Sequence, residues 1–141
     1  MHIGLIGGIG VAATVVYYQK LTAAVAAKGH KLDLTIVHAD APELVRNNTN
    51  DDRAAQADVS ARLIDRLNAA GCDCAAITSL GGHFCFAEMI EEKDADAIVL
   101  AGTDLNLAFD GIDPGYRVVD ALDVHVDLLA QLAVGEAQLP S

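Results

Sequence analysis

The sequence contains no tryptophan, and aromatic residues make up only 4% of its 141 residues. Because 52% of the residues are nevertheless hydrophobic, we expect a core built mainly of Ala, Val, Leu and Ile. Side chains of this size are typical where helices pack closely on a parallel sheet. The length is that of one domain.

Positive charge is also scarce, since nine Lys and Arg residues against twenty Asp and Glu residues give a formal net charge of −11. Nucleic-acid-binding proteins need Lys and Arg side chains to replace phosphate counterions, and anionic membrane surfaces attract the same residues. We therefore expect no nucleic-acid partner and no membrane partner. A small anionic substrate is compatible with this composition, because a pocket can be locally positive inside an acidic protein.

Cysteine occurs only at Cys72, Cys74 and Cys85. An odd number without framework spacing is unlike a secreted disulfide scaffold, and four ligands at metal-binding spacing are absent from the sequence. Cys72 and Cys74 are two residues apart, so a strand would point both to one face. We interpret both as small hydrophobic side chains in the core, because free cysteine is usually buried. No hydrophobic run approaches the roughly 20 residues of a membrane span, and the first residues lack a signal peptide's basic segment. These features predict a cytoplasmic protein.

Hydrophobic periodicity predicts alternating strands and helices. Short apolar or β-branched runs predict strands at residues 2–6, 32–40, 72–78, 94–102 and, as a short fifth strand, 116–120. Helical spacing predicts helices at 12–28, 51–70, 84–93 and 123–133. Pro42 and the polar residues 47–50 indicate a loop over 41–50. The order predicts an α/β fold, a parallel sheet of four to five strands with helices on both faces.

In such a sheet the functional crevice lies beyond the carboxyl ends of the strands. The turn after the first strand reads Gly-Gly-Ile-Gly-Val-Ala-Ala-Thr, residues 7–14. Its glycines let the backbone approach a ligand, and the helix that follows offers N–H groups to an anion. Gly8, Gly10 and Ala13 also fit the dinucleotide-binding pattern G-x-G-x-x-A. That alternative needs an acidic residue about 20 residues on, whereas Asp40 lies thirty residues beyond Gly10.

Four segments carry a more specific pattern. The glycine loop and a helix with the pair Tyr17-Tyr18 form residues 3–21, and AGCDCAAITSLGGH forms residues 70–83. DADAIVLAGTDL (94–105) and VVDALDVHVD (118–127) follow. In content and order these segments resemble the aspartate/glutamate racemase family, with its Gly-Gly-Met-Gly-like opening, its Cys-Asn-Thr-x-His and Gly-Cys-Thr-Glu-Leu motifs, and its terminal Asp-x-x-x-x-His.

The resemblance implies a cofactor-independent isomerase that removes and returns the α-proton of aspartate, glutamate or a similar small carboxylate. It also implies one lobe of a two-lobe fold, in which residues 1–89 resemble the N-terminal lobe and residues 94–141 the final strand and helix. The second lobe normally separates the two cysteine motifs, yet here only residues 84–93 do so. Our hypothesis is that most of that lobe was lost near residues 89–93.

The catalytic cysteines of the family are replaced. By position the first corresponds to Ser79, with Thr78 as the alternative, and the second to Gly102. A serine hydroxyl is a far weaker acid than a thiol and needs an adjacent base, so the two-thiol mechanism cannot run on these residues. Cys85 could be a displaced catalytic thiol. The favoured interpretation is a buried helix residue beside Phe84, because free cysteine is usually a small core residue.

The resemblance assigns catalytic roles to Ser79, His83, Thr103 and Asp104, and substrate binding to Gly8, Ile9, Gly10, Thr14, Arg46, Thr78, Gly81 and Gly102. Structural alternatives stay open, because His83 fits a loop or cap, Thr103 and Asp104 fit a helix cap, and Arg46 fits a solvated loop. His125 and Asp120 are expected to orient the last helix. A catalytically inactive carboxylate-binding relative is the main alternative function. Exposure of the surface that met the second lobe predicts a homodimer.

Overall fold

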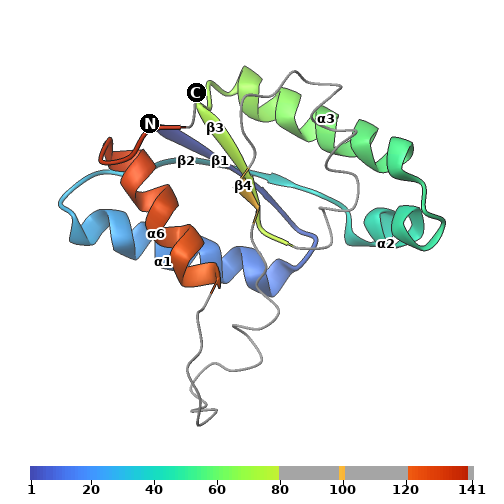
Figure 1. Cartoon of the computed structure of the whole chain (residues 1–141), viewed down its shortest axis with the longest axis horizontal. Helices are drawn as coiled ribbons and strands as arrows, with labels where there is room; N and C mark the ends of the chain where they lie inside the picture. Colours follow the sequence, from blue (N-terminus) through green and yellow to red (C-terminus); the bar gives the residue numbers. More distant parts are fainter. Residues whose placement is uncertain (80–98, 101–120, 140–141) are drawn as a thin grey trace, which may run out of the picture.

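A parallel sheet organises the protein in the computed structural model, which describes residues 1–79, 99–100 and 121–139. Strands β1 (His2–Gly7), β2 (Asp33–His38), β3 (Cys74–Ile77) and β4 (Val99–Leu100) lie in the order β2-β1-β3-β4 (Figure 1). Every pairing is parallel, with β2 and β3 on either side of β1. The α/β class is therefore confirmed. Within the described residues three strands are full and β4 contributes two residues, against the four to five strands predicted; residues 116–120, the predicted fifth strand, lie outside the described residues.

Helices cover both faces of the sheet, as predicted. Helices α1 (Val11–Ala27) and α6 (Ala121–Val134) lie on one face and α3 (Arg53–Ala69) lies on the other (Figure 1). Alternate residues of a strand point to opposite faces, so Ile3 and Leu5 pack with α1 and α6 while Ile6 packs with α3. Full burial of one such aliphatic side chain stabilises the fold by about 1.5–3 kcal/mol.

Helix α6 is joined to α1 by a buried polar contact. The hydroxyl of Tyr17 lies 2.6 Å from Nδ1 of His125, and the two rings meet edge to face with centroids 5.3 Å apart. An ion pair between Lys20 and Asp123 (2.5 Å) lies on the same pair of helices. His125 thus holds the last helix in place, in line with its predicted role, while Asp120 lies outside the described residues.

Helix α2 (Ala41–Thr49) corrects the prediction of a loop over residues 41–50. The Asp40 carboxylate accepts a hydrogen bond from the Glu43 N–H at 3.1 Å, and Pro42 lies in the first turn, where the helix uses no N–H. Asn47, part of the polar run, is buried and donates to Oε1 of Gln56 in α3 at 3.1 Å. Asn47 is therefore part of a packed helix surface, while the rest of the polar run, residues 48–50, is exposed at the end of the helix.

The segment before β3 holds a second correction. Residue 73 is a bend, and β3 begins only at Cys74. As a result, Cys72 packs against the cluster under α3 while Cys74 packs against the cluster under α1 and α6. The prediction that one face carries both cysteines is wrong. By contrast, the predicted capping of the helix at 51–70 is confirmed, since Asp52 accepts from the Ala55 N–H at 3.1 Å.

No helix in the described part of the chain combines the length and the apolar composition that a membrane span requires.

Candidate functional site

The carboxyl ends of β1, β2 and β3 meet at one edge of the sheet. We call this edge the rim and define it as residues 7–10, Thr14, 38–39 and 78–79. The Ala39 N–H donates to the Gly7 carbonyl oxygen at 2.7 Å, which holds the end of β2 against the glycine loop. The Thr78 N–H donates to the Ile6 carbonyl oxygen at 3.1 Å, which holds the end of β3 on the other side. The loop is therefore flanked by both neighbouring strands.

Thr14 is the centre of the hydrogen bonds at the rim. Its hydroxyl oxygen accepts from the Gly8 N–H at 3.0 Å and donates to the Gly10 carbonyl oxygen at 3.0 Å. It also lies 3.3 Å from the hydroxyl oxygen of Thr78, which in turn donates to the Ile6 carbonyl oxygen at 3.2 Å. Three contacts need a hydroxyl proton: the bonds to the Gly10 and Ile6 carbonyl oxygens and the contact between the two hydroxyls. Thr14 and Thr78 have only two hydroxyl protons between them. Thr78 is fully buried, whereas Thr14 is partly exposed. The Thr14 hydroxyl is therefore the one that can turn towards a ligand oxygen, while Thr78 keeps its backbone partner.

Steric contacts explain two of the glycines. A Cβ on Gly7 would lie 2.3 Å from Cγ2 of Thr14. Gly8 has φ +96°, and a Cβ there would lie 2.5 Å from both the Ala39 carbonyl oxygen and Nδ1 of His38. Both positions require glycine so that the loop can fit between α1 and the end of β2. Gly8 therefore has a structural reason to be glycine in addition to its predicted role in binding.

The first turn of α1 lies open at the rim. Gly10 occupies the N-cap position, no side chain caps the helix, and the first turn holds no acidic residue. Val11 and Ala12, whose N–H groups belong to this turn, are exposed. Uncapped N–H groups and the helix dipole together attract an anion, with a dipole contribution of about 0.3–1 kcal/mol.

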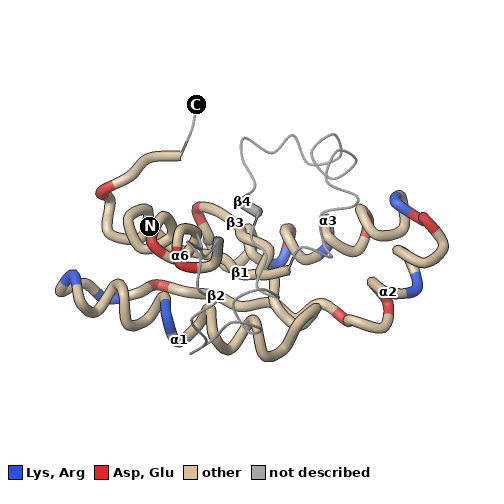
Figure 2. The backbone as a smooth tube through the Cα atoms, turned by 60° about the horizontal axis from the view of Figure 1, so that its bottom comes forward, with Lys and Arg blue, Asp and Glu red and all other residues tan. Residues whose placement is uncertain are grey.

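Charged side chains do not supply positive charge at the rim. The Lys and Arg residues that the structure describes lie along α1, after it, and on α2 and α3 (Figure 2). Arg46, a predicted substrate contact, lies on α2 rather than in a loop, is exposed, and pairs with Glu43 at 3.7 Å. An anion at the rim would therefore be held by N–H and O–H donors.

The remaining predicted residues divide into two groups. Ser79 follows Thr78 directly and is buried, with 9% of its surface exposed. The side chain of Ile9 packs against the cluster under α3, so only its backbone is available to a ligand. The other predicted residues lie outside the described residues: Gly81, His83, Gly102, Thr103 and Asp104.

His38 is a rim residue that the sequence analysis did not single out. It ends β2, is exposed, and its Nδ1 comes close enough to Gly8 to clash with any Cβ there. Its imidazole places ring nitrogens that can donate or accept a hydrogen bond next to the glycine loop. The signal for it was its place at the carboxyl end of a predicted strand.

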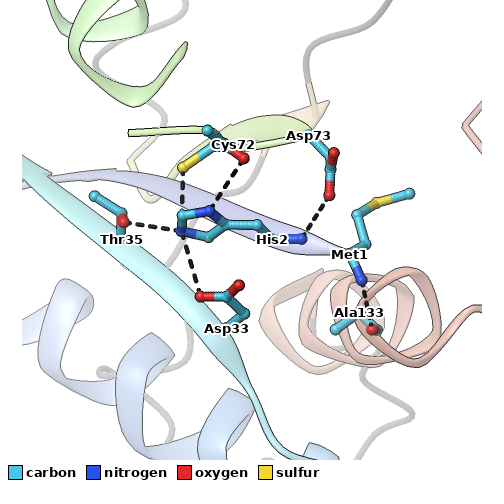
Figure 3. A network of polar contacts seen from close by, with 8 residues as sticks. Met1, His2, Asp33, Thr35, Cys72, Asp73 and Ala133 are labelled. Atoms are coloured by element: carbon cyan, nitrogen blue, oxygen red, sulfur yellow. Dashed lines mark hydrogen bonds and ion pairs between the residues drawn. The ribbon is translucent and has the colours of Figure 1, made fainter. Parts of the chain in front are cut away.

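A second polar cluster lies at the opposite edge of the sheet, around His2 (Figure 3). Nδ1 of His2 lies 3.1 Å from the Gly71 carbonyl oxygen, which can only accept, so Nδ1 carries a proton. In the neutral ring Nε2 then accepts from the Thr35 hydroxyl (2.9 Å) and lies 3.5 Å from the Cys72 sulfur. This cluster ties together the amino ends of β1, β2 and the turn before β3.

The chemistry of this second cluster is that of a structural clasp. Burial raises the pKa of the Cys72 thiol, with the Asp33 and Asp73 carboxylates adding to the rise and the nearby Thr35 hydroxyl opposing it. A thiol held in its protonated form is a poor nucleophile and a poor metal ligand. Within residues 1–79, 99–100 and 121–139, no three His, Cys, Asp or Glu side chains are grouped so that they could hold a metal ion.

Comparison with known proteins supports the fold. No family profile matches this sequence, and no curated protein matches it either. A solved structure does match it, that of a "putative Asp/Glu Racemase" from Yersinia pestis, with a TM-score of 0.62 and 21% sequence identity. The match covers 80% of this chain and 51% of that protein, so this chain spans about half of its length. The likeness shows that the described α/β unit has the fold of a lobe of that protein.

Proposed function

We propose that this protein is a relative of the aspartate/glutamate racemases that binds a small carboxylate, such as an acidic amino acid, at the rim. The observation that carries the proposal is the meeting of the Thr14 and Thr78 hydroxyls, 3.3 Å apart, under the glycine loop. The fold likeness to a protein described as an Asp/Glu racemase supports the same ligand class.

The donors at the rim are of the kind that a carboxylate needs. A carboxylate presents two oxygens and accepts about four hydrogen bonds. The open first turn of α1 supplies N–H groups, and the Thr14 hydroxyl supplies an O–H. A hydrogen bond to a charged group contributes about 1.5–3 kcal/mol. These donors can hold an anion although none of the described Lys and Arg residues lies at the rim.

Transfer of the α-proton is the second candidate function, and the position of Ser79 favours it. Ser79 is buried directly beyond Thr78 and stands where the family resemblance places the first thiol. Its hydroxyl needs an adjacent base; His38 lies at the same rim, but it ends β2, with β1 between it and Ser79. Racemisation also needs a second proton donor on the opposite face of the substrate. The position that the family resemblance assigns to that donor is Gly102, which cannot transfer a proton. It and the other predicted catalytic residues, His83, Thr103 and Asp104, lie outside the described residues.

Deuterium exchange tests the catalytic part of the proposal. Incubation with aspartate or glutamate in D2O, followed by NMR of the α-proton, is expected to show loss of that signal above the rate without protein. A Ser79→Ala variant is expected to abolish the exchange while it still binds the ligand. Exchange at the background rate in the natural protein would contradict catalysis without touching the binding proposal.

Dinucleotide binding is less well supported by the rim. The acidic residue that would bind a ribose hydroxyl, Asp40, instead accepts the Glu43 N–H and caps α2. A thermal shift with NAD or FMN larger than the shift with dicarboxylates would reverse this preference.

Calorimetry tests carboxylate binding, with aspartate and succinate as the probes. Thr14→Val removes the partly exposed hydroxyl and is expected to weaken binding about tenfold or more, whereas Thr14→Ser keeps the hydroxyl and retains binding. Thr22→Val is the matched control, because Thr22 lies on the same helix and donates to the Tyr18 carbonyl oxygen away from the rim. Absence of binding to the natural protein, or equal weakening by the control, would contradict the proposal.

A further inference from the structure

Strand β2 forms an outer edge of the described sheet. It pairs with β1 on one side, and no strand of the described residues pairs with it on the other. The Ala39 N–H points to β1, and backbone direction alternates along a strand. The N–H and C=O groups of Leu34 and Ile36 therefore point outward. An edge of this kind is a template for pairing with another strand unless the protein covers it.

A groove of mixed polar and apolar lining runs beside this edge. It lies between α1 and β2, and its apolar side includes Tyr18, Leu34 and Ile36. Ile36 and Tyr18 are 41% and 52% exposed, and Val15, one turn before Tyr18 on α1, is 47% exposed. Large apolar side chains gathered at an open strand edge mark an association surface.

The charges along the edge identify the occupant. The amino end of β2 is preceded by the basic residues His30 and Lys31, and its carboxyl end is followed by the acidic residues Asp40 and Glu43. When β2 of a second copy lies antiparallel beside this β2, the basic residues before each strand face the acidic residues after the other. Within the strand the exposed end residues have the opposite order, Asp33 first and His38 last, and an antiparallel copy brings these two together as well. A parallel copy would place like charges together, which is unfavourable. The edge is therefore complementary to itself in the antiparallel direction.

We propose that a second copy of this chain pairs with β2 in the antiparallel direction, about a two-fold axis perpendicular to the sheet at Thr35. Such an axis keeps each face of the sheet on the same side in both copies. Residues that lie directly opposite each other must then have side chains on the same face, so their two residue numbers add up to an even number, here 70. Leu34 then lies opposite Ile36 of the partner subunit, both with outward backbone groups, and the two apolar side chains close the groove. His30 comes to lie opposite Asp40 of the partner subunit.

The proposed interface is independent of the carboxylate proposal and differs from the lobe surface expected from the sequence. It extends the sheet across both copies and is isologous, as closed dimers require. Apolar side chains and backbone hydrogen bonds both contribute to this interface. The pairing covers the edge of β2 in each copy.

Analytical ultracentrifugation over a concentration series tests the interface. The natural protein is expected to be a dimer, and Ile36→Lys is expected to be a monomer, because an edge lysine opposes strand pairing. Val124→Lys is the matched control, since Val124 is 61% exposed on α6 and away from β2; it is expected to stay dimeric. Circular dichroism confirms that each variant is folded. A monomeric natural protein, a dimeric Ile36→Lys variant, or dissociation by Val124→Lys would overturn the proposal.

A cross-link tests the register. Thr35 lies on the proposed axis as a non-hydrogen-bonded pair with its own copy, where Cβ atoms are about 4.5–5.5 Å apart, close to disulfide reach. Thr35→Cys, in a background with Cys72, Cys74 and Cys85 replaced by alanine, is expected to form a reducible dimer on mild oxidation. Val124→Cys in the same background is expected to remain a monomer on a denaturing gel. No cross-link at position 35, or an equal one at position 124, would overturn the register.

Discussion

At the scale of single residues, the rim depends on close contacts that leave no space for larger side chains. Gly8 combines a positive φ with contacts to the end of β2, and Thr14 fills the space beside Gly7. The same contacts bring the Thr14 and Thr78 hydroxyls together. Packing and ligand binding are thus properties of the same few residues.

Substitution of Gly8 by alanine is expected to destabilise the protein by about 3 kcal/mol or more, because backbone strain adds to the contact with His38 and Ala39. Gly29→Ala is the control. Gly29 also has a positive φ, of +76°, but a Cβ there meets nothing within 4 Å, so only the strain of about 1–2 kcal/mol remains. Urea denaturation of both variants measures the difference, and equal losses would contradict the steric account of the loop.

The location of the rim could be predicted from the sequence, but its detailed contacts could not. Glycines after β1 and Thr78 after β3 lie at the carboxyl ends of parallel strands, which topology alone brings together. The bond between Thr14 and Thr78 depends on how α1 leaves the loop, and periodicity carries no such information. His38 was missed for the same reason, since its nearness to Gly8 follows from the close approach of two strand ends.

Alkaline pH is expected to weaken the fold through the thiol of Cys74. Burial raises its pKa above the ordinary value of 9.0, with Asp73 adding to the rise. The unfolded state therefore loses the proton first, and stability falls as pH rises from about that value towards the higher folded pKa. Cys74→Ala lacks this loss, so its stability relative to the natural protein should improve between pH 8 and 10 in urea titrations. A pH-independent difference would contradict the account.

At the scale of elements, α2 shows what the sequence analysis overlooked. Pro42 and the Asn-rich run favoured a loop, because Asn and Thr have low helix propensity. The same residues contain a helix start, since Asp40 at the N-cap and Glu43 three residues on have the spacing of a capping box. Local composition was outweighed by capping and by the burial of Leu44 and Asn47 against α3.

Removal of the Asp40 cap is expected to cost stability. Asp40→Ala leaves the Glu43 N–H without its side-chain acceptor and should lower the free energy of unfolding by about 1 kcal/mol. Asp58→Ala is the control, because Asp58 is exposed within α3, where alanine has the higher helix propensity. Thermal and urea denaturation compare the two. A loss in Asp58→Ala as large as that in Asp40→Ala would contradict the capping role.

At the scale of the whole molecule, α6 begins more than 40 residues after the end of β3, yet it packs on α1 and β1 at the start of the chain. The buried contact between Tyr17 and His125 and the surrounding apolar cluster join the first and last described helices. Tyr17 and Tyr18 are adjacent in sequence, yet Tyr17 is fully buried while Tyr18 is 52% exposed. The pair therefore has one structural member and one surface member.

Loss of the Tyr17 hydroxyl is expected to loosen the packing of α6. Tyr17→Phe keeps the ring contact with His125 but removes a buried hydrogen bond of 2.6 Å, which should cost about 1–3 kcal/mol. Tyr18→Phe makes the same change at an exposed site and should be neutral within about 0.5 kcal/mol. Hydrogen exchange of the α6 amides shows whether the loss is local to that helix. Equal stability of the two variants would contradict the role of the buried contact.

The most direct test of carboxylate binding is a titration with aspartate followed residue by residue. In 15N-correlated NMR spectra, the largest saturable shifts are expected at the amides of Gly8, Gly10, Val11, Ala12 and Thr14, with a further shift at Thr78. Thr22, in the second half of α1, and Gly29, just beyond its end, should hardly move. Shifts confined to other parts of the chain, or none at saturating aspartate, would contradict the claim that the rim holds a small carboxylate.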